Sequence, residues 1–177
     1  MGGIVIKYQQ VTNIHDFNKA KIMFPENNKQ IIQHYERSLY WIKSLSDISE
    51  VQWRMPIEPG KWSVAEVIGH LSPWDEFVLN HRIPFFFVKK CLPKGPDVAW
   101  MNTIAAKKSR EQSMEETIKN FIATRSQLLQ AVQSFSDEQW QQLFTVGQSE
   151  ITVIAYFIGL VNHDLHHFSQ VQNVIHV

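Results

Sequence analysis

Three histidines lie within five residues near the C-terminal end of the chain, in the run Asn162-His163-Asp164-Leu165-His166-His167. On a helix, His163 and His167 stand one turn apart and about 40° apart around the axis, so both can bind one ion. A further histidine, His70, lies far away in a second apolar segment. Two histidines one turn apart plus one from another helix are typical of a metal site with an open coordination position. We therefore take His70, His163 and His167 as candidate metal ligands.

The placement of the pair favours metal binding over the simpler alternatives. A buried histidine is usually a hydrogen-bonded core residue, and two that are four apart can arise by chance among eight. However, His163 and His167 fall on the apolar stripe of Leu160 and Val171, where an unpaired imidazole is costly to desolvate. Zinc held this way lowers the pKa of bound water to roughly 7 and deprotonates a bound thiol. Imidazoles also suit nickel, iron and cobalt, so the sequence predicts a divalent ion, zinc or nickel first, without fixing which.

Two neighbours of these histidines are further candidates. His166 lies about 60° from His163 around the helix, so we interpret it as a non-ligand: a proton shuttle, or a surface or interface residue. Glu66 precedes His70 by one turn and can lie behind it as an outer carboxylate. Glu66 also completes a capping box with Ser63, which is the simpler explanation. The zincin motif His-Glu-x-x-His is absent from the chain.

Other residue types are assigned more simply. Trp100 and Asn102 fall on a long connection, where we expect a loop that touches a substrate. His81 lies about 16 Å along the helix from His70, too far to share an ion. The remaining tryptophans are expected to be core residues. We expect surface positions for the three histidines that remain, His15, His34 and His176.

Four long helices are predicted from the spacing of apolar residues and from capping residues. They cover residues 27–45, 63–81, 113–132 and 149–174, with a short turn at 136–140 and a kink or break at Pro73. The connection between the second and third helices contains Pro93, Gly95 and Pro96 and is longer than the usual 2–8 residues. It can cross the bundle, which makes these helices parallel, or cover a site. The fold class is therefore all-α: a four-helix bundle with a long crossover.

Composition excludes several classes of function. The 177 residues carry 17 basic and 17 acidic side chains, without the basic excess of a duplex nucleic-acid binder or of an electrostatic membrane footprint. The longest apolar stretch, 151–161, is too short to span a bilayer, and no signal peptide or myristoylation motif is evident. Cys91 is the only cysteine, which suits a reducing cytoplasm. We expect a cytoplasmic protein with one domain over 1–177 and its core at about 27–174, acting without nucleic acid or membrane.

Two motifs resemble those of the DinB-like (YfiT-like) superfamily. Residues 59–71, Pro-Gly-Lys-Trp-Ser-Val-Ala-Glu-Val-Ile-Gly-His-Leu, look like the opening of its second helix. Residues 162–170, Asn-His-Asp-Leu-His-His-Phe-Ser-Gln, resemble the motif of its fourth helix. The turn Ser-Asp-Glu-Gln-Trp at 136–140 is also in keeping, so the resemblance covers roughly 27–174.

The resemblance implies a four-helix bundle with a long crossover, often a homodimer, that binds a divalent metal through His70, His163 and His167. The family includes proteins described as metal-dependent hydrolases and transferases of bacillithiol or related low-molecular-weight thiols. On family grounds we expect transfer of such a thiol to an electrophilic small molecule. The alternatives are a metal-dependent hydrolase of a small substrate, or a non-catalytic stress-response bundle with a structural metal, which a fourth protein ligand would favour.

Overall fold

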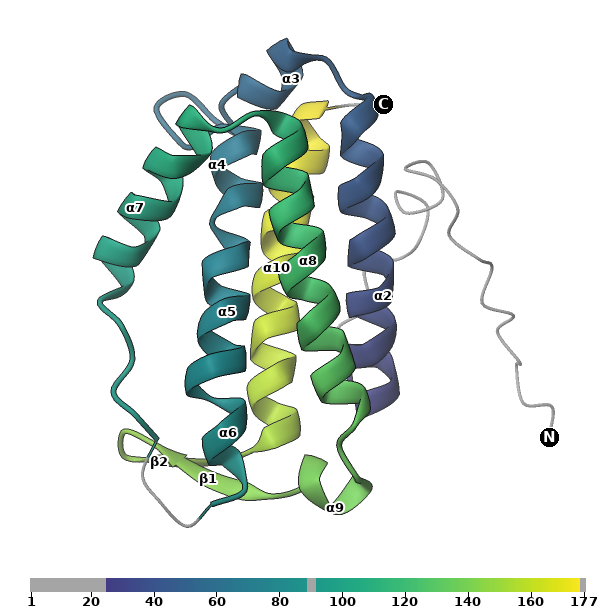
Figure 1. The fold of residues 1–177 in the computed structure, drawn as a ribbon, viewed down its shortest axis with the longest axis vertical. Coiled ribbons are helices and arrows are strands. Elements are labelled where there is room, and N and C mark those ends of the chain that lie inside the picture. Colours follow the sequence, from purple (N-terminus) through teal and green to yellow (C-terminus); the bar gives the residue numbers. More distant parts are fainter. Residues whose placement is uncertain (1–24, 89–91, 176–177) are drawn as a thin grey trace, which may run out of the picture.

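The computed structural model describes residues 25–88 and 92–175 and consists mainly of four long helical rods that lie side by side (Figure 1). The rods are α2 (Asn28–Ser44), α4 (Val64–Gly69) continued by α5 (Leu71–His81), α8 (Met114–Gln133) and α10 (Val153–Ile175). The predicted four-helix bundle is therefore confirmed. Three residues named above, Cys91, His15 and His176, lie outside the described residues, as do residues 4–6, whose run Ile-Val-Ile suggests an extended arm.

The helices begin where the sequence provides capping side chains. Asn27, Ser63 and Ser113 each accept a hydrogen bond from a first-turn amide, and Ser63 forms the predicted capping box with Glu66. Apolar faces then pack into two clusters. The first cluster lies towards the end of α10, and its large buried side chains include Trp41, Trp53, Phe121 and Phe168. The second lies towards the start of α10, and its buried side chains include Phe86, Leu128, Trp140 and Phe157. The prediction of core tryptophans is confirmed for Trp41, Trp53 and Trp140.

The second rod is interrupted at His70, three residues before the predicted position. Pro73 provides no amide hydrogen, and its ring crowds the carbonyl of the residue four positions earlier, Gly69. A proline therefore disturbs the turn that precedes it, and the helix is interrupted at His70, between α4 and α5. This break places His70 at a junction rather than within a regular helix.

The long connection crosses the bundle but is not the loop that the sequence led us to expect. It contains two helices, α6 (Ile83–Phe86) and α7 (Val98–Glu111). Helix α7 runs back along the outside of the bundle, and α5 and α8 are therefore parallel (Figure 1). Trp100 and Asn102 are therefore helical. Helix α7 lacks a long apolar stripe, because its buried residues are the small Ala105, Ala106 and Ser109.

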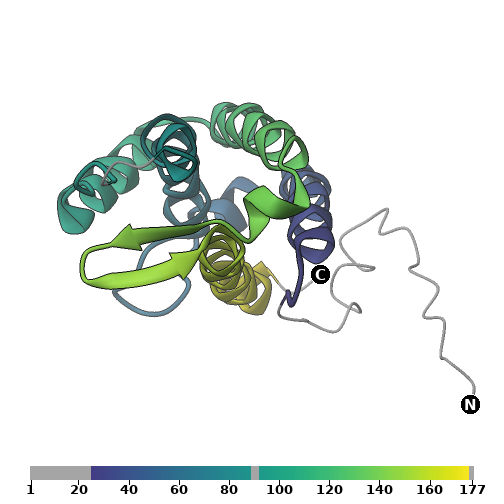
Figure 2. The same ribbon diagram turned by 90° about the horizontal axis from the view of Figure 1, so that it is seen from below.

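A second correction concerns the start of α10, which begins at Val153 rather than Ser149. After α9 (Asp137–Trp140), strands β1 (Leu143–Val146) and β2 (Ser149–Thr152) form an antiparallel hairpin. The hairpin crosses one end of the bundle (Figure 2). Gly147 has φ +61° as the first residue of the two-residue turn, the position where a type II′ turn favours glycine. Four-residue strands are too short to give an alternating pattern, so the sequence did not reveal them.

A 3₁₀ turn (Leu45–Asp47) and the short α3 (Glu50–Arg54) join α2 to α4.

None of the described helices has the length and apolar character that crossing a bilayer requires.

Candidate metal centre

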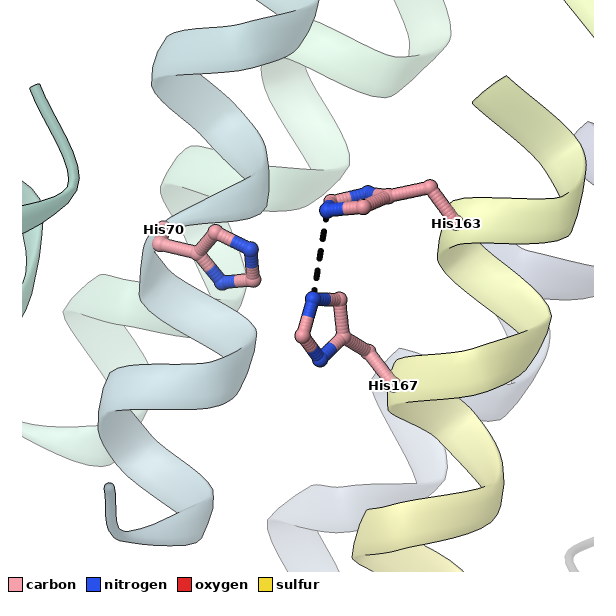
Figure 3. Close-up of side chains that lie close together, drawn as sticks. All are labelled: His70, His163 and His167. Atoms are coloured by element: carbon pink, nitrogen blue, oxygen red, sulfur yellow. Dashed lines mark hydrogen bonds between the residues drawn. The ribbon is translucent and has the colours of Figure 1, made fainter. Parts of the chain in front are cut away.

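Three imidazoles face one another between the second rod and α10 (Figure 3). His70 comes from the α4–α5 junction, and His163 and His167 come from successive turns of α10. One ring nitrogen from each lies within 4.8 Å of the others. The ring centroids are 5.5 Å apart for His70 and His163, 4.5 Å for His70 and His167, and 4.5 Å for the α10 pair. The structure thus brings together the three residues that the sequence singled out.

Burial decreases steadily across the cluster. The His70 side chain is enclosed, with 1% of the residue exposed, whereas His167 is half-buried and His163 is exposed. The indole of Trp62 packs edge-on against the His70 ring at a centroid distance of 5.0 Å. The cluster therefore has a closed apolar side at His70 and a side open to solvent at His163.

In two of the rings, a hydrogen bond at Nδ1 determines that Nε2 is the nitrogen with a free lone pair. His70 Nδ1 lies 2.6 Å from the Val67 carbonyl oxygen, an acceptor, so Nδ1 carries the proton that it donates. His167 Nδ1 lies 2.8 Å from Gln170 Oε1 and donates in the same way. In both neutral rings Nε2 then has a lone pair. His163 Nε2 is 3.2 Å from His167 Nε2 and donates its proton to that lone pair.

The environment keeps these histidines neutral at physiological pH. Burial, and then the nearby His167, lower the pKa of His70 to about 3. Burial and the nearby His163 lower the pKa of His167 to about 4, and burial also lowers the pKa of His163. Neutral imidazole is the form that binds a metal. Three such rings with converging nitrogens fit a divalent cation.

The other candidates from the sequence lie apart from this cluster. His166 is exposed, with its ring centroid 5.2 Å from that of His167, and does not belong to the group of converging nitrogens. Glu66 accepts hydrogen bonds from Ser63 and from the guanidinium of Arg110. The capping role of Glu66 is thus the one observed.

Asn102 links two helices. Its side-chain oxygen accepts a hydrogen bond of 2.9 Å from the indole of Trp74, which ties α7 to α5. The neighbouring Trp100 is 65% exposed. The expectation that Trp100 and Asn102 lie on a loop was therefore wrong. Asn102 makes a contact between two helices, and Trp100 is an exposed helical residue.

His34 is not the surface residue that we expected. Its Nε2 lies 3.0 Å from Oδ2 of Asp164, and its ring stacks on Phe168. Burial lowers the pKa of His34, although the Asp164 carboxylate opposes this shift. Asp164 points away from the face of α10 that carries His163 and His167, because its carboxylate bonds His34 and Arg125.

Sequence reasoning gave no role to Val67 or Gln170, which bond the rings of His70 and His167. A backbone carbonyl such as that of Val67 leaves no mark in a sequence. Gln170 does leave one, because it follows His167 by three residues and so shares its face of the helix.

Comparison with known proteins agrees with the fold and places the chain in a family. YfiT from Bacillus subtilis, described as a probable metal-dependent hydrolase with an unusual four-helix bundle topology, superposes with a TM-score of 0.65. The two sequences are 15% identical, and the match covers 88% of this chain and 91% of that one. A search of curated proteins gave no match. A family model of the DinB superfamily matches residues 30–171, and the chain therefore belongs to that superfamily.

Proposed function

We propose that this protein is a metal-dependent enzyme that transfers a low-molecular-weight thiol of the bacillithiol type to an electrophilic small molecule. The observation that carries the proposal is the convergence of His70, His163 and His167, three neutral imidazoles, of which His70 is buried and His163 is exposed to solvent. In this proposal the three rings hold a divalent cation, with zinc and nickel the ions best suited to imidazole.

When bound, such a cation supplies Lewis-acid chemistry that lowers the pKa of a thiol or a water molecule that reaches it. The chain's own residues restrict access to this position. His70 and Trp62 close the inner side, so a reactant approaches past His163, the most exposed of the three rings. The exposed His166 stands beside His167 and can pass the released proton to solvent.

We prefer thiol transfer to hydrolysis on family grounds, and the carboxylates nearest in sequence to the three histidines are consistent with this choice. A thiol becomes a nucleophile by losing one proton, and its sulfur then forms a bond to the electrophilic carbon as the leaving group departs. Hydrolysis often uses a carboxylate as general acid or base in addition. Asp164 and Glu66, the acidic side chains closest in sequence to the three histidines, instead bond Arg125 and Arg110.

The second candidate function is hydrolysis of a small substrate. The description of YfiT as a probable metal-dependent hydrolase supports it, through a likeness of fold at 15% identity. The same three histidines hold the ion in this alternative. For either function we propose one domain acting on small molecules in the cytoplasm as a homodimer, without nucleic acid; the zero formal net charge supports the last point.

The test begins with metal content. Protein purified without a polyhistidine tag should retain about one divalent ion per chain. His163→Ala should lose this ion, while His166→Ala should keep it. A protein that takes up neither zinc nor nickel would contradict the proposal and would favour a non-catalytic bundle.

The second step separates the two reactions. The metal-loaded protein is offered a chromogenic electrophile with and without a series of small thiols, and chromogenic esters and amides in parallel. Turnover that depends on a thiol supports the transferase, and thiol-independent cleavage supports the hydrolase. Neither activity should survive in His163→Ala.

A further inference from the structure

We infer that Gln170 is a positioning residue for the metal centre. By accepting the Nδ1 proton of His167, it fixes the tautomer in which His167 Nε2 presents a lone pair to His70 and His163. This inference rests on the proposed metal-binding function, but its structural step can be tested on the metal-free protein.

The geometry assigns the role to this side chain. Gln170 follows His167 by three residues on α10, so the two side chains stand on the same face. The distance from Oε1 to Nδ1 is 2.8 Å, that of a normal hydrogen bond. Free imidazole exchanges its proton between both nitrogens, and a bond at one nitrogen decides which of them remains available to a cation.

A matching arrangement at His70 supports the inference. The Val67 carbonyl accepts the Nδ1 proton of His70 at 2.6 Å, so the buried ring presents Nε2 in the same way. Two of the three rings are thus already in the ligating tautomer. Only His163 has to transfer its proton from Nε2 to Nδ1, because its Nε2–H is donated to His167.

Of the two acceptors, the Val67 carbonyl and the Gln170 side chain, only the second can be removed by mutation. A main-chain carbonyl cannot be removed by substitution, whereas Gln170 can be changed without altering any of the three rings. Gln170→Leu removes the acceptor at similar size. Gln170→Glu retains an oxygen that can only accept, so it distinguishes an accepting side chain from one that donates.

The experiment uses the full chain labelled with ¹⁵N at histidine. Long-range ¹⁵N–¹H correlation spectra of the metal-free protein at pH 7.5 report the tautomer of each ring. Zinc affinity is then measured by competition with a chromophoric chelator. Asn173→Leu, an exposed substitution on the same helix, serves as the matched control, and circular dichroism checks folding.

We expect His167 to carry its proton on Nδ1 in the wild type, in Gln170→Glu and in Asn173→Leu, and to shift towards Nε2–H in Gln170→Leu. Zinc affinity should fall about 10–100-fold in Gln170→Leu, as for other residues that orient a metal-bound histidine. It should stay within about threefold of wild type in Gln170→Glu.

Three results would overturn the inference. They are an unchanged His167 tautomer in Gln170→Leu, zinc affinity within about twofold of wild type in that variant, or a loss in Gln170→Glu as large as in Gln170→Leu. If the wild type binds no zinc, the proposed function fails, and the spectra of the metal-free protein still decide whether Gln170 sets the tautomer.

Discussion

Asp164 and Arg125 form an ion pair inside the bundle, one residue away from the candidate ligand His163. Both carboxylate oxygens of Asp164 accept hydrogen bonds from the guanidinium, which comes from α8. Arg125 also donates to Asp75 of α5 at 2.7 Å, so one buried cation holds three helices together. Although burial raises the pKa of Asp164, the charge of Arg125 and hydrogen bonds from His34 and Arg125 hold it well below its usual value. This network fixes the rotation of α10, and hence the face that presents His163 and His167.

Replacing Arg125 should destabilise the protein strongly. Arg125→Met leaves two buried carboxylates without their cation, and breaking a buried pair in this way costs about 3–5 kcal/mol. Urea unfolding followed by circular dichroism measures the loss. The exposed Lys119→Met on the same helix is the control and should change stability by about 0.5 kcal/mol or less. A loss below about 1 kcal/mol for Arg125→Met would show that the network contributes little.

The sequence predicted the rods of the bundle because their apolar residues recur at helical spacing and their first turns carry capping side chains. It missed α7 because that helix buries little more than Ala105, Ala106 and Ser109, and exposes Trp100 and Ile104. Small buried residues and large exposed ones hide the periodicity that indicates a helix.

At the site, helical spacing was enough to choose His163 and His167 as a pair of candidate ligands on one face of a helix. Sequence alone could not reveal the partners of buried polar groups. The bond between His34 and Asp164 joins residues 130 positions apart, and the bond from His70 ends on a backbone oxygen. Both depend on how the helices meet.

Gly69 should be intolerant of a side chain. A Cβ atom there would lie 1.9 Å from Ser109 Oγ and 2.8 Å from Ser109 Cβ, so α7 would have to move away from α4, next to His70. We expect Gly69→Ala to cost about 1–3 kcal/mol, as overpacking usually does. Thermal unfolding measures the cost.

Removing the opposing side chain should restore part of this loss. The double variant Gly69→Ala/Ser109→Gly should be more stable than the sum of the two single changes predicts, because the residues are in contact. Simple additivity would mean that the clash is relieved in another way, without displacement of α7.

Acid should destabilise the metal-free protein partly through His70. The pKa of this ring is about 3 when folded and about 6.5 when unfolded, so the unfolded chain binds the extra proton between these values. The contribution of His70 is therefore complete above pH 6.5 and is lost as the pH falls towards 3. In this range, His70 contributes up to about 1.4 kcal/mol per pH unit to the slope of the free energy of unfolding against pH.

The slope is obtained from urea unfolding at several pH values between 6.5 and 4.5, with a chelator present. Because other groups also titrate there, the informative quantity is the difference between the wild type and His70→Leu. We expect the slope to be smaller in the variant by about one proton. Equal slopes would mean that His70 becomes protonated in the folded state within this range.

A divalent ion should stabilise the folded chain through the three histidines. A ligand that binds only the folded state adds about 2.7 kcal/mol at a concentration one hundred times its Kd. Zinc and nickel should therefore raise the Tm of the wild type in a concentration-dependent manner. His70→Ala and His163→Ala should lose most of this shift, because each removes one of the converging nitrogens. His166→Ala should keep it, since that exposed ring lies outside the cluster although it neighbours His167. If the shift disappears in His166→Ala and persists in His70→Ala, the ion is bound by surface histidines of α10 rather than between the helices.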